Sequence, residues 1–210
     1  MIVVMSKILF YISLFIVFWA MIGYPISLKF LKVLFKNRRL KKDYSYIPTV
    51  TVMVVAHNEE KVIWDKLENL INLDYPKEKI EFLISSDNST DKTNELVEEF
   101  IKLNPDYRIR LYKVKERRGK TNAQNEAQKT VNSEILVMTD ANSILEKNSV
   151  KELVASFTSD DISYVCGRLV ITNQDTNDIA KTETLYWDTD TELREIESNM
   201  QTITAGNGAI

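Results

Sequence analysis

The chain has one cysteine, Cys166, among its 210 residues, so no disulfide can form within it. This thiol lies in an apolar, strand-like run, ISYVCGRLVI, where an unpaired cysteine packs as a small hydrophobic side chain, and we expect it to be buried and inert. The sequence also lacks the glycine-rich patterns Gly-x-Gly-x-x-Gly and Gly-x-x-x-x-Gly-Lys-Ser/Thr. These absences exclude an intrachain disulfide framework and leave the familiar dinucleotide and phosphate-loop sites without support.

Acidic residues are missing from the first 42 positions, which hold eight Lys and Arg residues. Positions 43–210 therefore hold 19 basic and all 30 acidic residues, although the net charge of the whole chain is only −3. Such an acidic region lacks the basic face that nucleic acid requires, so we expect no nucleic-acid partner. It can still bind an anionic small molecule when a divalent cation lies between the two.

Charge is also missing from residues 8–28, ILFYISLFIVFWAMIGYPISL. As a helix this stretch is about 30 Å long, which matches the hydrocarbon core of a bilayer. We predict a transmembrane anchor in residues 1–31, with Pro25 kinking its end, followed by a basic juxtamembrane linker in 32–47. This linker suits an anionic membrane surface or is merely solvated.

The flanking charges set the expected orientation of this anchor. Seven of the eight basic residues follow the apolar stretch, so the positive-inside rule places the chain from residue 29 onward in the cytoplasm, at the inner face of the cell membrane. A cleaved signal peptide is the alternative. It fits poorly, because the apolar run is too long, no small-x-small site follows, and the charge lies on the wrong side.

Strand and helix patterns alternate between residues 49 and 158. The predicted strands cover 49–56, 80–86, 107–115 and 134–139, and the predicted helices cover 62–71, 91–103 and 119–131. This alternation predicts an α/β fold with a mostly parallel sheet and helices on both faces. Ligands of such sheets bind outside the carboxyl ends of the strands, which here carry the polar sequences AHNE, SDNS and TDANS.

Four segments in order resemble the motifs of the membrane-bound family 2 glycosyltransferases. VTVMVVAHNEE resembles the first strand with its Asn-Glu-Glu helix start, and SSDNSTDKT resembles the Asp-Asp-Gly-Ser-x-Asp-x-Thr loop. RRGKTNAQNEA resembles the Gly-Lys-x-x-Ala-x-Asn-x-Ala helix start, and VMTDANS resembles the Asp-x-Asp strand end. Farther on, GRLVI and ETLYWDTDTELREIESNMQTITAGNGAI resemble the segments that face the donor sugar and the acceptor. The resemblance runs from about residue 48 to 210 and points to the branch that builds bacterial surface polysaccharides.

The resemblance implies a GT-A (Rossmann-like) nucleotide-sugar-binding domain in residues 48–210. It implies a hexosyltransferase-type enzyme that transfers a sugar, with inversion, from a nucleotide sugar to a glycan or lipid-linked acceptor. Uridine diphosphate is the expected carrier, and Mg²⁺ or Mn²⁺ the expected cofactor, because a divalent cation and a lysine stabilise a diphosphate leaving group. Two alternatives stay open: a non-catalytic nucleotide-binding or split partner module, and a lipid-phosphate sugar transferase of the same fold.

The family's functional positions carry over to individual residues of this sequence. The expected nucleotide-binding residues are Ala56, His57, Glu59, Asp87, Lys120 and Asp140. The expected metal ligands are Asp140 and Asn142, and the expected donor-sugar or acceptor side holds Tyr186, Trp187, Gly206 and Gly208. Asp87 would accept a base N–H, and Lys120 would meet a phosphate at its helix start. Ser89 and Asp91 would fix the turn, with Asp91 as the helix N-cap.

Each of these residues also has a plain structural explanation. His57 can be a packed strand-end residue, Asp87 a turn former and Asp140 a strand terminator. Lys120 can be a solvated helix lysine, because the neighbouring Lys115, Arg117 and Arg118 repel it. Tyr186 and Trp187 suit core packing within a helix equally well.

The sequence departs from the family pattern at three places. Asn142 replaces the second carboxylate of Asp-x-Asp, and an amide oxygen is still a hard ligand, so we expect a weakened metal site. Asn88 takes the place of a glycine in a left-handed turn that asparagine tolerates, and Ser86 replaces the first Asp of that loop. Finally, the chain stops at Ile210, before the family's acidic motif with the general base and its Gln-x-x-Arg-Trp helix. We therefore expect an incomplete domain with little activity alone and assign no catalytic residue.

Overall fold

The computed structural model of the protein describes residues 2–34, 41–159, 161–170 and 178–200. The chain divides into two compact units. One is an α/β unit within residues 40–169, and the other contains the N-terminal helix and the helix of residues 178–199. Each unit is described by itself.

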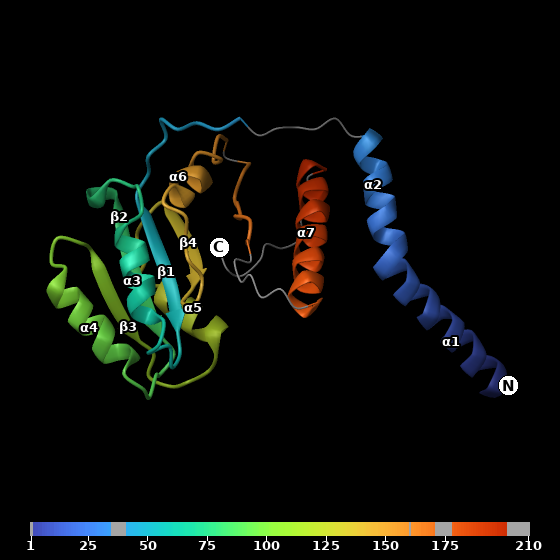
Figure 1. The fold of residues 1–210 in the computed structure, drawn as a ribbon, viewed down its shortest axis with the longest axis horizontal. Helices are drawn as coiled ribbons and strands as arrows, with labels where there is room; N and C mark the ends of the chain where they lie inside the picture. The colour runs from blue at the N-terminus through green and yellow to red at the C-terminus, as the bar shows by residue number, and fades with distance from the viewer. Residues whose placement is uncertain (1, 35–40, 160, 171–177, 201–210) are drawn as a thin grey trace. The chain divides into compact units, whose positions relative to one another are not determined.

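The α/β unit is built on a four-stranded parallel sheet (Figure 1). Its strands are β1 (Val50–Ala56), β2 (Ile80–Ser86), β3 (Ile109–Lys113) and β4 (Ile135–Asp140), in the order β3-β2-β1-β4. The central strand β1 reads VTVMVVA and is buried on both faces, which explains why it is apolar except for Thr51. The predicted parallel α/β fold is confirmed, and each strand lies within two residues of its predicted bounds.

Helices cover both faces of this sheet. The helices are α3 (Ile63–Ile71), α4 (Thr93–Leu103), α5 (Lys120–Gln128) and α6 (Ser149–Val154), with a 3₁₀ turn η2 at Lys77–Lys79. The main core lies between one face and α3, α4 and α6, where Val52, Phe82 and Ile84 meet Leu67 and Phe100. A smaller cluster of Met53, Leu83 and Ala127 packs α5 onto the opposite face. The larger core therefore lies on the face to which alternate apolar side chains of β1 and β2 point.

The apolar run around Cys166 behaves differently from the expectation. Residues 163–170 form no strand, because they pair with no strand of the sheet, and the Cys166 side chain is half-buried rather than buried. An apolar alternation predicts a strand only where a partner supplies the ladder of hydrogen bonds.

The N-terminal segment is helical from Ile2 to Leu34, through α1 (Ile2–Phe18), a π-helical turn η1 (Trp19–Gly23) and α2 (Tyr24–Leu34). The π turn precedes Pro25, and the N–H of Tyr24 bonds to the carbonyl of Trp19. Such a widened turn relieves the clash of a proline ring with the preceding turn, so the helix continues past Pro25. At Gly23 a Cβ would lie 2.5 Å from Cε3 of Trp19, so a larger residue here would require the Trp19 ring to shift.

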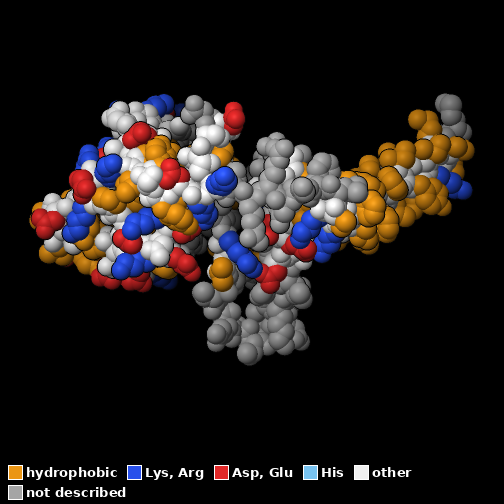
Figure 2. All heavy atoms as spheres, turned by 90° about the horizontal axis from the view of Figure 1, so that it is seen from above, with side chains coloured by type: hydrophobic (Ala, Val, Ile, Leu, Met, Phe, Trp, Pro, Cys, Tyr) orange, Lys and Arg blue, Asp and Glu red, His pale blue; other side chains and the backbone are white. Residues whose placement is uncertain are grey.

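The same segment has the length and composition of a membrane helix. The span Val3–Val33 covers 31 residues with a mean hydropathy of 2.1, and its most apolar part is entirely unburied in this structure. Figure 2 shows hydrophobic side chains covering this helix. The predicted span 8–28 lies inside it, and residues 32–34 of the predicted linker continue the helix.

In this unit α7 (Asp178–Asn199) packs beside α2. Leu28 and Ile196 are buried, and Nζ of Lys29 lies 2.8 Å from Oε2 of Glu192. The hydroxyl of Tyr24 donates to the carboxylate of Glu197. The end of the apolar helix thus combines a buried apolar side chain with charged partners from α7.

Candidate nucleotide-binding site

Two loops at the carboxyl edge of the sheet are fastened to each other. Asn58 after β1 has φ 57° and Asn88 after β2 has φ 53°, a left-handed conformation that asparagine tolerates. Oδ1 of Asn58 accepts the N–H of Thr90 at 2.8 Å. The N–H of Asn58 donates to Oγ of Ser89 at 3.2 Å, so the expected turn-fixing role of Ser89 is confirmed.

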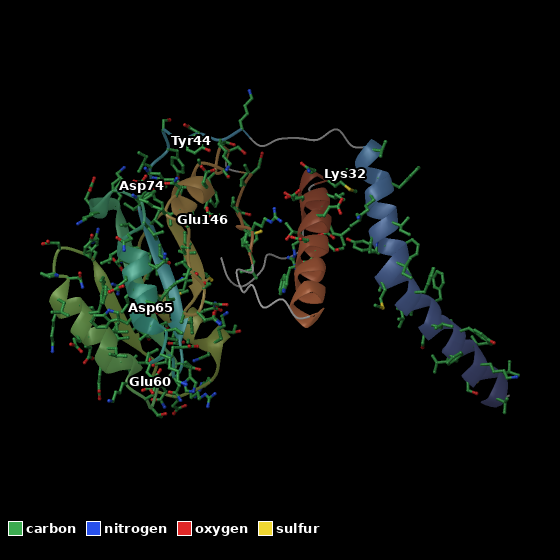
Figure 3. The ribbon with its side chains drawn as sticks, in the orientation of Figure 1. Lys32, Tyr44, Glu60, Asp65, Asp74 and Glu146 are labelled. Carbon is green, nitrogen blue, oxygen red and sulfur yellow. The ribbon has the colours of Figure 1, made fainter. Side chains whose placement is uncertain are left out.

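Asp91 joins the same loops a few residues farther on. Its carboxylate accepts the backbone N–H of Glu60 at 3.1 Å and that of Thr93 at 3.0 Å. Glu60, labelled in Figure 3, in return accepts the N–H of Lys92 at 3.1 Å. Burial raises the pKa of Asp91, but the hydrogen bonds from Thr93 and Glu60 outweigh it and hold the pKa below its usual value. Asp91 thus fixes the start of α4, although the N-cap residue is Lys92 rather than the predicted Asp91.

Asp87 is buried and holds the loop that leads into α5. Its side chain accepts the backbone N–H of Gly119 at 3.0 Å and that of Arg118 at 3.3 Å. Its own carbonyl lies 2.8 Å from Nδ1 of His57. Gly119 has φ 90°, a conformation that favours glycine, so the turn before α5 depends on this residue. Three predicted site segments therefore converge on Asp87.

Lys120 and Asp140 form an ion pair. Lys120 opens α5 and Asp140 ends β4, which lies beside β1 on the side away from β2. The order reverses here, because the chain moves outward from β1 to β3 and then returns to the other side of β1. Such a switch point is where open α/β sheets bind ligands. Lys120 is about half exposed and Asp140 about one-third exposed, so both remain accessible from solvent.

Lys66 is a site residue that the sequence analysis missed. Its side chain is fully buried, and its ammonium donates to Oγ1 of Thr139 at 3.0 Å and to the carbonyl of Ser143 at 2.6 Å. Burial lowers the pKa of Lys66 to about 8, while the negative charge of Asp140 raises it. A signal was present in the sequence, because Lys66 lies three residues after Ile63 on the apolar face of α3.

The oxygen atoms of Asp140 and Asn142 suit a divalent cation but form an incomplete site by themselves. Asn142 is exposed in the turn after β4, two residues from Asp140. Within the described part of the chain no group of three or more His, Cys, Asp or Glu side chains converges to hold a metal. One carboxylate and one amide fit a cation that draws its remaining oxygen ligands from a bound diphosphate.

The other predicted site residues divide into two groups. Ala56 is buried at the end of β1, and His57 and Glu59 are half-buried in the following loop, close to Asp87 and Thr93. Trp187 lies half-buried on α7, which belongs to the other unit. The side chain of Tyr186 and the residues Gly206 and Gly208 lie outside the described residues.

Several known proteins are similar to this chain over much of its length. YdaM, a probable glycosyltransferase of Bacillus subtilis, is 31% identical over 177 residues, which are 80% of this chain and 42% of that protein. A β-monoglucosyldiacylglycerol synthase of Nostoc is 31% identical over 137 residues, or 65% of this chain and 29% of that protein.

Among solved structures, a mannosyltransferase of Pyrobaculum calidifontis, in complex with GDP-Man and Mn²⁺, is 32% identical with a TM-score of 0.63. The match covers 68% of this chain and 42% of that one, so this chain spans less than half the length of each of these three proteins. The model of glycosyl transferase family 2 matches residues 51–210. The chain therefore belongs to glycosyl transferase family 2.

Proposed function

We propose that this chain forms the donor-binding part of a membrane-anchored glycosyltransferase. It transfers a hexosyl group from a nucleotide sugar, UDP-linked, to a glycan or lipid-linked acceptor, with inversion, at the cytoplasmic face of the cell membrane. The observation that carries the proposal is the accessible Lys120–Asp140 pair at the switch point of the sheet, beside the loops that Asp87 holds.

Each residue has a task in donor binding. Asp87 fixes the backbone of Arg118 and Gly119. These bonds set the position of the first turn of α5, and with it the position of Lys120. Lys120 exchanges its partner Asp140 for the diphosphate when the donor binds, because a diphosphate offers more negative charge than one carboxylate. The ammonium then stabilises the charge that develops on the leaving group.

A divalent cation fits this scheme as a partner of the diphosphate. The residues that would hold it are Asp140, released by Lys120, and Asn142. When bound, such a cation neutralises the charge on the leaving diphosphate. The mannosyltransferase complex with GDP-Man and Mn²⁺ supports a nucleotide-sugar donor and a divalent cation for this fold.

The proposed nucleotide base and the proposed membrane location rest on different observations. The preference for uridine rests on the resemblance of the Asn-Glu-Glu and SSDNSTDKT segments, whereas the related structure holds GDP. The anchor is supported by the helix Val3–Val33 and by Lys29 and Lys32 near its end. A cytoplasmic orientation follows from this basic flank if the helix spans the membrane.

The test is nucleotide binding by the full chain in detergent, measured by calorimetry. We expect UDP to bind with Mn²⁺ present, to bind at least tenfold more weakly with a chelator, and to lose a comparable share of affinity in Asp140→Ala. The same titration with GDP in place of UDP shows whether the site binds the uridine or the guanosine nucleotide more tightly. The control variant is Asp74→Ala, because Asp74 also pairs with a lysine, Lys151 at 2.7 Å, away from the site. Equal UDP affinity in the wild type, with chelator and in Asp140→Ala would refute the metal-assisted donor site.

A further inference from the structure

The buried ammonium of Lys66 calls for a functional explanation. A lysine that is fully buried costs free energy unless its charge is compensated by nearby groups. Lys66 contacts the end of β4 and the turn that follows it: Oγ1 of Thr139, the carbonyl of Ser143 and, at 3.5 Å, Oγ of Ser143. Thr139 and Ser143 flank Asp140 and Asn142 in the sequence, so the ammonium contacts both ends of the segment that carries the two predicted metal ligands.

The turn itself is closed around this ammonium. Oγ1 of Thr139 and Oγ of Ser143 lie 2.9 Å apart, and Oγ of Ser143 donates to the carbonyl of Asp140 at 3.0 Å. Lys66 therefore joins the strand end to the residue three positions after Asp140. A turn that is tied at both ends presents its intervening side chains in a defined geometry, as a ligand site requires.

A neutral residue of the same helix makes a parallel contact. Asn69, three residues after Lys66 on α3, donates to the carbonyl of Leu145 at 2.8 Å and accepts the N–H of Leu145 at 2.8 Å. Both residues fasten the chain after β4 to α3. Only Lys66 brings a charge, and that charge acts on Asp140. A purely structural fastening needs no ammonium, as Asn69 demonstrates.

The charges around this turn differ from those of an Asp-x-Asp motif, which has two carboxylates. Asp140 is the single carboxylate of the turn, Asn142 is neutral, and two lysines act on Asp140, one exposed and one buried. This arrangement favours an anion over a free cation. A buried charge is screened little by salt, so the effect of Lys66 persists where that of an exposed lysine fades.

We propose that Lys66 is a positioning residue of the donor site. Its ammonium holds the turn that carries Asp140 and Asn142, and its charge offsets that of Asp140, so that the nucleoside diphosphate binds with less dependence on a divalent cation. This role rests on the proposed donor site. The ligand that it serves is the diphosphate group, which neither Lys66 nor its partners Thr139 and Ser143 need to touch.

The experiment compares three variants of the full chain in detergent: Lys66→Met, Lys66→Arg and Asn69→Ala. For each, calorimetry gives the dissociation constant of UDP with Mn²⁺ and with a chelator, and thermal unfolding gives the Tm. GDP replaces UDP if the wild type binds GDP more tightly. The quantity of interest is the ratio of the two dissociation constants, chelator over Mn²⁺, because a general loss of stability leaves this ratio unchanged.

We expect Lys66→Met to raise this ratio about tenfold, the effect of one unit charge acting across several ångströms of protein. Lys66→Arg keeps the charge and should keep the ratio, even if its larger head group lowers the Tm. Asn69→Ala should lower the Tm with the ratio unchanged. If Lys66→Met does not fold, Lys66→Gln, which retains a donor without charge, takes its place with the same expected ratio.

Two outcomes would overturn the proposal, and they are distinguishable. A ratio in Lys66→Met that equals the ratio in Asn69→Ala would show that Lys66 fastens the turn and nothing more. A wild type that binds neither nucleotide under either condition would remove the donor site, and with it the role of Lys66.

Discussion

The two edges of one sheet differ in how their polar residues are used. At the carboxyl edge, side chains bind the backbone of neighbouring loops, as Asp87 does for Arg118 and Gly119. At the amino edge, Nη2 of Arg110 lies 2.6 Å from Oε1 of Glu81 and also donates to the carbonyl of Thr130 at 3.2 Å. A cavity of about 310 Å³ lies at this amino edge, lined by polar residues.

This difference explains why the amino-edge cavity is a poor candidate for the ligand site and the carboxyl edge a good one. Glu81, which lines the amino-edge cavity, already pairs with both Arg110 and Arg108, so a ligand there must compete with ion pairs already formed. At the carboxyl edge the loops are fixed by buried bonds, while the accessible pair of Lys120 and Asp140 can change partners. Fixed backbone with exchangeable charges is the arrangement that ligand binding needs, and cavity volume alone does not reveal it.

The largest effect is expected from Asp87→Ala. This change leaves the backbone N–H groups of Arg118 and Gly119 without their acceptor, in a part-buried setting. We expect a loss of about 3 kcal/mol in the free energy of unfolding, measured by urea denaturation, and no detectable UDP binding. The reason for the second loss is that the start of α5, and with it Lys120, is no longer held.

The matched control for Asp87→Ala is Asp74→Ala. Asp74 pairs with a lysine instead of with backbone N–H groups, and both its side chain and that of Lys151 are exposed, so little stability and no UDP affinity should be lost. Equal losses in the two variants would mean that the buried bonds of Asp87 do not organise the site.

The second prediction concerns the pH dependence of stability. The pKa of Lys66 is lowered from 10.5 to about 8 by burial, so the folded chain gives up this proton before the unfolded chain does. Between pH 8 and 10 the unfolded state therefore binds more protons, and the free energy of unfolding should rise with pH. The cost of the buried charge is relieved there, by about 2 kcal/mol. Urea denaturation across this window should show the rise in the wild type and lack it in Lys66→Met.

The upper limit of this window is set by a second group. Burial raises the pKa of Tyr75 to about 12, with smaller contributions from Tyr46 and Glu134. Above pH 10 the folded state therefore binds more protons than the unfolded state, and stability falls as pH rises. A wild type and a Lys66→Met variant with the same slope from pH 8 to 10 would contradict the lowered pKa of Lys66.

The fold was predictable because its signals are local. Apolar runs such as VTVMVVA and the helical spacing of Ile63, Leu67 and Leu70 depend on neighbouring residues alone, and the structure confirms them. The arrangement of the site is not local. Lys66 meets Thr139 across 73 positions and Asp87 meets Gly119 across 32, and neither contact leaves a pattern in the sequence. Lys66 lies on an apolar helix face, yet only the turn after β4 explains why a lysine can be buried there.

The third prediction concerns the metal ligands at the carboxyl edge. Asn142→Asp should tighten Mn²⁺ binding in the presence of UDP by about threefold to tenfold, because a carboxylate is a stronger ligand for a hard cation than an amide. Asn142 is exposed, so the change should leave the Tm almost unaltered. A manganese titration with no gain would mean that residue 142 does not face the cation.

The smallest effect is expected from Glu81→Gln at the amino edge. This change removes the partner of Arg110, and also of Arg108, whose Nη2 lies 3.8 Å from Oε2 of Glu81. The arginine side chains are about half exposed, so the stability lost should be about 0.5 kcal/mol. UDP affinity should not change, because the amino ends of the strands lie a full strand length away from Asp140. A change in UDP affinity as large as that of Asp140→Ala would instead place the nucleotide in the amino-edge cavity, and the contrast between the edges would be wrong.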